Sequence, residues 1–265
     1  MLFIVKPLKP FAWIAAFMLA LAVVLIPLIY LYIGTQLPTL DSEFDLERLL
    51  RQSIESERKS VQLGLYEKSK ESVAFERPDF AKLPKNLVAF YITQRGCPTF
   101  FQTPREEGFK WAKRVLLGVV NVEPEDSDGW CERVFGINLA RRVGAKGKLE
   151  ESVAVHKIHR FLKKDGLIAY DLHTLKLEPG IIGVEAAAQV LFKKPLAELS
   201  LSELAEFQLA IPPHGYWNQM KACQNPILIK QNRDVILDEL RRVSLVPDDL
   251  ARAAQRQPVF CTRDD

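Results

Sequence analysis

The first strong pattern in the chain is an apolar run close to its N-terminus. Residues 11–34 carry no charged side chain and consist mainly of aliphatic and aromatic residues. At a rise of about 1.5 Å per residue, a helix of this length crosses the roughly 30 Å hydrocarbon core of a bilayer. The run therefore predicts a transmembrane helix. A cleaved signal peptide is the alternative, but its apolar region is normally about 7 to 15 residues long.

Charges on either side of this run predict its orientation. Lys6 and Lys9 precede it, whereas four acidic residues follow it, namely Asp41, Glu43, Asp45 and Glu47. Because positively charged flanks stay on the cytoplasmic side, residues 1–10 are predicted to form a cytoplasmic tail. Residues 11–34 then anchor the chain in the inner (plasma) membrane as a single span, and the bulk of the chain is predicted to be periplasmic or extracellular.

Beyond the anchor the pattern becomes amphipathic and helical. Residues 45–58 place apolar side chains at helical spacing between charged ones, which is typical of a helix with one buried face. We interpret residues 35–82 as a stalk or linker that continues away from the membrane. Residues 83–259 follow with mainly helical patterns and are numerous enough to bury a core. Residues 260–265 are left as a short C-terminal tail.

Two helical patterns of different kinds meet within residues 180–213. Small alanines crowd one face of a predicted helix over residues 184–192, which lets another element approach its backbone closely. A Lys-Lys-Pro sequence ends this helix. Ser200 caps the next one, with Glu203 as its reciprocal capping-box partner, and a Pro-Pro pair ends that helix in turn. The pattern predicts a helix, a tight turn and a second helix.

The order of residues in this segment resembles the last conserved block of the peptidoglycan glycosyltransferases, the family 51 transglycosylase domain of penicillin-binding proteins and their monofunctional relatives. There the block runs roughly G-V-x-x-A-A-x-x-Y-F-G-K, then L-x-L-x-E-x-A and a proline-rich stop. The matching residues here are Gly183, Val184, Ala187, Ala188, Leu191, Phe192, Lys194, Leu199, Leu201, Glu203, Ala205 and Pro212. The later stretch 232–237 (NRDVIL) resembles the family's R-x-x-x-V-L element. The resemblance implies a mainly α (α+β, lysozyme-like) external domain over residues 83–259; the alternative is a core-forming hairpin that matches by chance.

The resemblance also indicates where catalysis takes place in the family, and most of those positions have changed here. The family takes its catalytic base from the pattern E-D-x-x-F-x-x-H-x-G. In this chain Gln94 stands at the position of that Glu and Arg95 at the position of the Asp. A neutral amide cannot accept the proton of a sugar hydroxyl, so we assign no catalytic base. Glu106 and Glu107 are carboxylates a dozen residues further on, and we interpret them as the solvated start of a helix.

Three residues in the next two blocks remain candidates for contact with a diphosphate. Arg141 keeps a cation in the block that reads G-x-S-T-I-T-Q-Q-L-x-K-N in the family, although the Ser-Thr core of that block is absent. Lys148 and Glu151 match the block R-K-x-x-E, which orients the donor diphosphate in active relatives. All three are candidate substrate-binding residues, and Glu151 is also a candidate catalytic remnant. The alternatives are a solvated arginine and an ordinary i, i+3 ion pair between Lys148 and Glu151.

The fourth block and the histidines give no sign of a metal site. The family pattern I-L-E-x-Y-L-N has Ala169 in place of its Glu and His173 in place of its Asn. His156 and His159 are three residues apart, but no acidic ligand accompanies them at helical spacing. We therefore expect histidines of the surface or of the packing, and neither a metal nor a cofactor.

The four cysteines, Cys97, Cys131, Cys223 and Cys261, all lie on the predicted outward side, where disulfides form. The residues alone leave three pairings open, as well as free thiols. The proximity of the corresponding family motifs implies a disulfide between Cys97 and Cys131, and a second between Cys223 and Cys261.

Residues 109–120 (FKWAKRVLLGVV) mix basic and apolar side chains in a way that suits a membrane interface. In the family, the corresponding region belongs to a mobile subdomain that dips into the bilayer and receives lipid-linked substrate. An ordinary core helix with snorkelling basic side chains is the alternative.

Together these patterns favour a membrane-anchored, transglycosylase-like pseudoenzyme of the bacterial cell envelope. Its expected partners are the lipid bilayer and either lipid-linked peptidoglycan precursor, glycan or a cell-wall assembly protein. The net charge of +3 is too small to indicate a nucleic-acid partner. One alternative is an active peptidoglycan glycosyltransferase whose base is displaced to Glu106, Glu107 or Glu151. Another is an unrelated helical protein tethered to the membrane.

Overall fold

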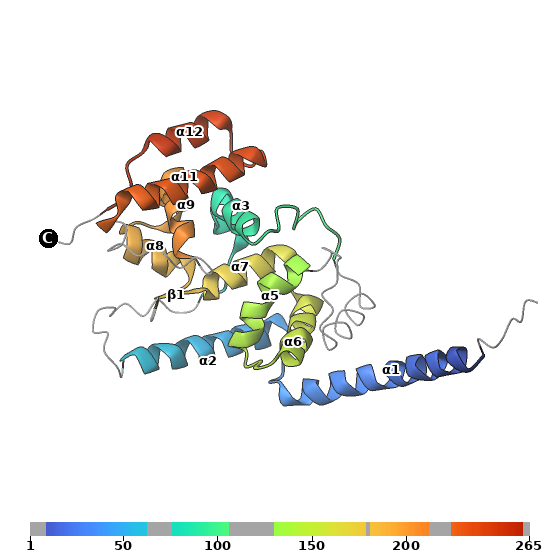
Figure 1. Ribbon diagram of the computed structural model, residues 1–265. Coiled ribbons are helices and arrows are strands. Elements are labelled where there is room, and N and C mark those ends of the chain that lie inside the picture. Colours follow the sequence, from blue (N-terminus) through green and yellow to red (C-terminus); the bar gives the residue numbers. More distant parts are fainter. Residues whose placement is uncertain (1–8, 63–75, 106–129, 179–180, 212–223, 262–265) are drawn as a thin grey trace, which may run out of the picture.

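The computed structural model describes residues 9–62, 76–105, 130–178, 181–211 and 224–261. Almost all regular structure in these ranges is helical, and the one sheet among them is a two-stranded hairpin. The predicted mainly α fold class is therefore confirmed. Figure 1 shows the helices gathered into one body, from which the first helix extends away on one side.

The first helix, α1 (Lys9–Gln36), touches the domain only through its C-terminal turns. Ile33 and Leu37 are buried there, and the ring of Tyr30 meets that of His156 edge-on at 5.8 Å between centroids. His156 belongs to α6 (Lys148–Phe161), so α1 and α6 pack together. Among the described residues no helix has the length and apolar character to cross a membrane. Several apolar side chains of α1 are not among the described side chains.

The second helix, α2 (Glu43–Gln62), is amphipathic as predicted, but it packs on the domain instead of extending away from it. Leu46, Leu50 and Ile54 follow one another every four residues, so they share one face, and each is at most 2% exposed. That face contacts α5 (Trp130–Arg142) and α6. The predicted stalk therefore contributes a helix to the core, because its apolar stripe finds a partner surface on the domain.

The centre of the domain consists of α3 (Lys85–Gln94), α5, α6 and α7 (Lys164–Thr174). A short 3-10 helix, η1 (Phe80–Lys82), precedes α3, and Asp79 caps it by accepting from the backbone N–H of Ala81. After α7 the chain forms an antiparallel hairpin of β1 (Lys176–Glu178) and β2 (Ile181–Ile182), in which Lys176 pairs with Ile182. The α5 and α6 helices make the most extensive contact between elements.

The predicted helix, turn and helix are present as α8 (Val184–Phe192), a 3-10 helix η2 (Leu196–Glu198) and α9 (Leu201–Ala210). Both bonds of the capping box form: Glu203 N–H donates to Ser200 Oγ at 3.2 Å, and Ser200 N–H donates to the Glu203 carboxylate at 2.8 Å. Gly183 precedes α8 with φ of +87°, and a Cβ there would lie 2.5 Å from the carbonyl oxygen of His173. Only glycine fits this close approach.

Two C-terminal helices, α11 (Pro226–Arg242) and α12 (Asp248–Arg256), cover α9. The guanidinium of Arg233 is fully buried between them and bonds to Glu206 of α9. The backbone N–H of Phe260 also donates to Glu206, and the Phe260 ring lies 5.0 Å from that of Phe192. The packed domain therefore reaches Phe260, one residue into the predicted tail.

Candidate functional site

The position of the family's catalytic base falls at the C-terminal end of α3, where Gln94 is the last helical residue. The side-chain amide of Gln208, a fully buried residue of α9, donates a hydrogen bond to the Gln94 carbonyl oxygen. Gln94 Nε2 and Gln208 Oε1 have no hydrogen-bond partner within the described part of the chain. Either orientation of the two amides leaves a neutral pair with no proton acceptor strong enough for general base catalysis.

Next to Gln94, a chain of hydrogen bonds leads to a buried carboxylate. Arg95 donates to the hydroxyl of Tyr91 at 3.3 Å, and that hydroxyl donates to Asp171 Oδ2 at 2.6 Å. Asn138 of α5 donates to the other oxygen of Asp171 at 3.0 Å. Asp171 is fully buried on α7. Its carboxylate therefore connects α3, α5 and α7 directly behind the Gln94 position.

Of the three candidate diphosphate contacts, the structure brings two together. Arg141 Nε donates to Glu151 Oε1 at 2.7 Å, which joins α5 to α6. The Arg141 side chain is 59% exposed and that of Glu151 only 11%, so the carboxylate holds a guanidinium that still faces solvent. Lys148 lies exposed at the start of α6, and no ion pair joins it to Glu151 in the described ranges. Glu151 therefore pairs with an arginine of the neighbouring helix, and not with Lys148 of its own helix.

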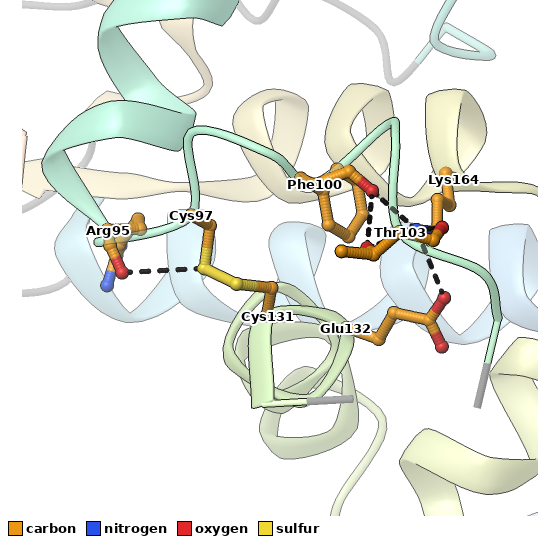
Figure 2. The surroundings of a disulfide bond; sticks show 7 residues. All are labelled: Arg95, Cys97, Phe100, Thr103, Cys131, Glu132 and Lys164. Carbon is orange, nitrogen blue, oxygen red and sulfur yellow. Dashed lines mark hydrogen bonds and ion pairs between the residues drawn. A yellow bond between two sulfur atoms is a disulfide. The ribbon is translucent and has the colours of Figure 1, made fainter. Parts of the chain in front are cut away.

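The loop that follows Gln94 is fixed on two sides, as Figure 2 shows. Cys97 and Cys131 form a disulfide that ties the loop to α5, the pairing that the family motifs implied. Lys164 of α7 donates to the carbonyl oxygens of Phe100 and Thr103, and its ammonium lies 4.7 Å from the centre of the Phe100 ring. Cys261 is disulfide-bonded as well, whereas Cys223, its predicted partner, lies outside the described residues.

Part of the chain is similar to a known protein family. Residues 136–241, from α5 to α11, match the transglycosylase family model. The predicted resemblance to a transglycosylase domain is therefore confirmed over these residues. Gln94 and α3 precede the matched residues, so the family model covers the fold after the changed base position.

Some relatives of this segment are much longer proteins than this chain. Penicillin-binding protein 1A of Rickettsia conorii is 24% identical over 197 residues, which cover 71% of this chain and 24% of the relative. Penicillin-binding protein 1A of Pseudomonas aeruginosa is 28% identical over 42% of the chain and 13% of its own length. The biosynthetic peptidoglycan transglycosylase of Ralstonia nicotianae is 25% identical over 38% of the chain and 43% of its own length. The chain therefore spans about a quarter of the length of the first of these relatives.

The buried carboxylate of Asp171 was not among the residues predicted to belong to the site. Burial raises its pKa to about 6, against the hydrogen bonds from Tyr91 and Asn138 and the charges of Arg95 and Arg142, which lower it. It cannot touch a sugar hydroxyl, because none of its surface is exposed. We assign it the role of positioning α3 relative to α5 and α7. The signal in the sequence is a single acid within the otherwise mostly apolar stretch 167–172.

We expect Asp171→Asn to remove a pH dependence of stability. A carboxyl whose pKa is raised from 3.8 to about 6 on folding stabilises the fold in its protonated form, so its contribution is lost as pH rises through this window. The difference in free energy of unfolding, wild type minus variant, should fall by on the order of 3 kcal/mol from pH 4 to pH 7. Urea unfolding at both pH values measures it, and an unchanged difference contradicts it. Burial lowers the pKa of His159 to about 4, so its contribution to the free energy of unfolding grows as pH rises, opposite to that of Asp171. Both proteins contain His159, so its contribution cancels in the difference.

The remaining predicted residues either lie outside the described ranges or pack elsewhere in the domain. Glu106, Glu107 and the amphipathic stretch 109–120 lie outside the described residues. His159 is mostly buried with its Nδ1 3.6 Å from the carboxylate of Glu132, and His156 packs on Tyr30. No group of three or more potential metal ligands occurs in the part of the chain that the structure describes.

Proposed function

We propose that this chain is a membrane-anchored, transglycosylase-like protein of the cell envelope that binds lipid-linked peptidoglycan precursor, glycan or a partner protein without polymerising glycan. Residues 11–34 anchor it, its N-terminus is cytoplasmic, and the domain faces the periplasm or the outside of the cell. The observation that carries the proposal is the Gln94–Gln208 amide pair at the position of the family's catalytic Glu.

The chemistry of glycosyl transfer supports the loss of activity. The reaction needs a carboxylate that takes the proton of the attacking sugar hydroxyl, and its loss costs about 10² to 10⁴ in rate. At the end of α3 the described groups are the amide of Gln94, the guanidinium of Arg95 and the phenol of Tyr91. The carboxylate behind them, that of Asp171, is sealed from solvent.

Retained cations support the binding role. Arg141 presents an exposed guanidinium whose direction is set by the nearly buried Glu151. A guanidinium held in this way suits phosphate oxygens, because its planar fork can donate two bonds at once. Lys148 adds a second exposed cation at the start of the neighbouring helix.

The form of α1 supports the anchor. It is one unbroken helix of 28 residues, which at about 1.5 Å per residue is long enough for a bilayer. Large apolar side chains along it are exposed, among them Trp13, Phe17 and Tyr32, which are 68–78% exposed. Such a surface calls for an apolar environment.

Polymerisation of lipid-linked disaccharide by the purified full chain, reconstituted in bilayers, tests the catalytic part. We expect no glycan chains above background from wild type or from Gln94→Ala. Polymerisation that is abolished by Gln94→Ala contradicts the proposal. Polymerisation that survives Gln94→Ala but is lost in Glu151→Gln supports the alternative of a displaced base.

Binding of the same lipid-linked precursor tests the other part. We expect Arg141→Ala to weaken it roughly 10-fold or more, because a charge-assisted hydrogen bond is lost. Arg242→Ala is the matched control, since Arg242 is an exposed arginine paired with Glu239 on α11, and it should leave the affinity unchanged. Equal affinities of wild type and Arg141→Ala exclude a diphosphate contact at Arg141.

A further inference from the structure

The end of α1 is packed against α6, which fixes how far α6 can be from the membrane. Tyr30 of α1 contacts His156 of α6 here, and Ile33 in the last turns of α1 and Leu37 just after it are at most 8% exposed. Packed helices run about 8 to 10 Å apart. If residues 11–34 form the anchor, as proposed above, the C-terminal part of α6 therefore lies at the outer surface of the bilayer.

A lysine of α6 stands at the level where the predicted span ends. A Cβ built on Gly34, the last residue of that span, would lie 3.9 Å from both Cε and Nζ of Lys157. The end of the lysine side chain therefore lies beside the backbone of Gly34. Since the headgroup layers add roughly 5 to 7 Å to each side of the hydrocarbon core, an ammonium at Gly34 falls within one of them.

Two further groups extend this basic surface. Arg160, one turn after His156 on α6, is exposed, and its charge acts on Tyr30. Tyr30 is an aromatic residue near the outer end of the span, where such rings favour the interface. Asp41, in the turn between α1 and α2, is the acidic group whose charge acts on Tyr30. Within the described residues neither Lys157 nor Arg160 has a carboxylate at ion-pair distance.

We propose that Lys157 and Arg160, the α6 basic face, bind the phosphate groups of anionic lipids in the outer headgroup layer. The inference rests on the proposed anchor and adds a second attachment to it. Charge complementarity and continuity with α1 select lipid as the occupant, because the helix that carries the face is held against the anchor itself. Each basic side chain near an anionic membrane surface contributes to binding, and the attraction is screened by salt.

This attachment has a consequence for the candidate binding residues. Glu151, which holds Arg141, lies on the same helix as Lys157, six residues or about 9 Å along its axis. Contact of the α6 basic face with headgroups would therefore hold the Arg141 guanidinium at a defined distance from the membrane surface. A flexible tether would leave that distance undefined.

Thermal unfolding of the full chain in nanodiscs tests the inference. The probe is disc composition: phosphatidylcholine alone, or phosphatidylcholine mixed with phosphatidylglycerol. We expect the domain of the wild type to melt higher in the mixed discs by on the order of 4 to 8 °C, and this gain to shrink in high salt. Lys157→Ser/Arg160→Ser should lose the gain while melting normally in phosphatidylcholine.

The control variant is Arg252→Ser/Arg256→Ser, which removes two exposed arginines from α12, far from α1 in Figure 1. It should keep the full gain. A wild type with no gain, or a Lys157→Ser/Arg160→Ser variant that keeps it, overturns the inference. If that variant does not fold, the wild type alone decides: a rise in melting temperature in the mixed discs that does not shrink in high salt overturns the inference. The proposed anchor is refuted by a different result: the full chain fails to enter nanodiscs, or alkaline carbonate releases it from them. Failure of the anchor can therefore be distinguished from failure of the lipid-binding inference.

Discussion

Replacement of Arg233 by methionine is expected to lower the free energy of unfolding by about 3 to 5 kcal/mol, because it leaves a buried charge without its partner. Arg233 is fully buried, and its guanidinium donates to the carboxylate of Glu206 at 2.9 Å and to Ser202 at 2.8 Å. It also donates to three backbone carbonyls near the C-terminus, those of Gln255, Gln257 and Pro258. One side chain thus holds α11, α9 and the segment after α12 together.

The same substitution also removes the counter-charge of Glu206. Burial already raises the pKa of Glu206, and the hydrogen bonds from Phe260 N–H and Arg233 oppose that rise. Without the guanidinium, we expect the pKa of Glu206 to rise further, so that the carboxyl takes up a proton more readily instead of remaining charged in the core. The loss of stability should therefore be smaller at acidic pH, where the proton is available.

Thermal and urea unfolding of the domain measure this effect, and the midpoint should fall by roughly 6 to 20 °C. Arg242→Met, which removes an exposed pair with Glu239, is the control and should change stability by less than about 0.5 kcal/mol. Arg233→Met combined with Glu206→Leu should regain much of the loss, since replacing both buried partners is far less costly than removing one. If Arg233→Met unfolds like the control, the assignment of this arginine as a central tie is wrong.

Arg233 shows what the sequence could and could not predict. The stretch 232–237 was matched to a family element, but nothing in it indicates burial of a guanidinium. The partners that make burial acceptable come from α9, from the end of α12 and from the segment after it, at separations of 22 to 31 residues. Local pattern predicts a helix with an arginine on it, and only the tertiary structure shows that three carbonyl groups converge there.

The hairpin of α8 and α9 was predictable in detail because its signals are local. Capping box, small-residue face and glycine all act within a few residues of one another. The amphipathic α2 was predicted as a helix, but its partner was not. An apolar stripe at period 3.6 shows which face of a helix is buried, but it does not identify the element that the face packs against. A stalk helix and a core helix therefore have the same pattern.

The candidate site was predictable only in part. Sequence placed Gln94 where the family has its base, and paired Cys97 with Cys131 by resemblance. It did not predict that Gln208 would face Gln94 or that Asp171 would lie behind Tyr91, because these contacts join residues 114 and 80 positions apart. From the spacing of the residues, Lys148 was a candidate ion-pair partner of Glu151. In the structure the partner of Glu151 is Arg141 of the preceding helix. Whether these groups contact substrate stays a prediction.

The disulfide between Cys97 and Cys131 gives the second large expected effect. It closes a separation of 34 residues, and a loop of that size restricts the unfolded chain by roughly 3 to 4 kcal/mol. Cys97→Ala/Cys131→Ala should therefore lower the free energy of unfolding by about that amount. Unfolding in urea without reductant measures it, and a change below about 1 kcal/mol contradicts the entropic contribution assigned here.

A reductant alone does not replace this double variant, because Cys261 is also disulfide-bonded and would be reduced in the same experiment. Cys97 is 1% exposed, so we expect the native domain to resist dithiothreitol and the bond to open only once the domain unfolds. Lys164 should keep part of the loop in place in the double variant, through its bonds to Phe100 and Thr103. Hydrogen exchange of residues 97–103 separates the two contributions: protection that survives in the double variant but falls in a triple variant with Lys164→Met assigns the remainder to the lysine.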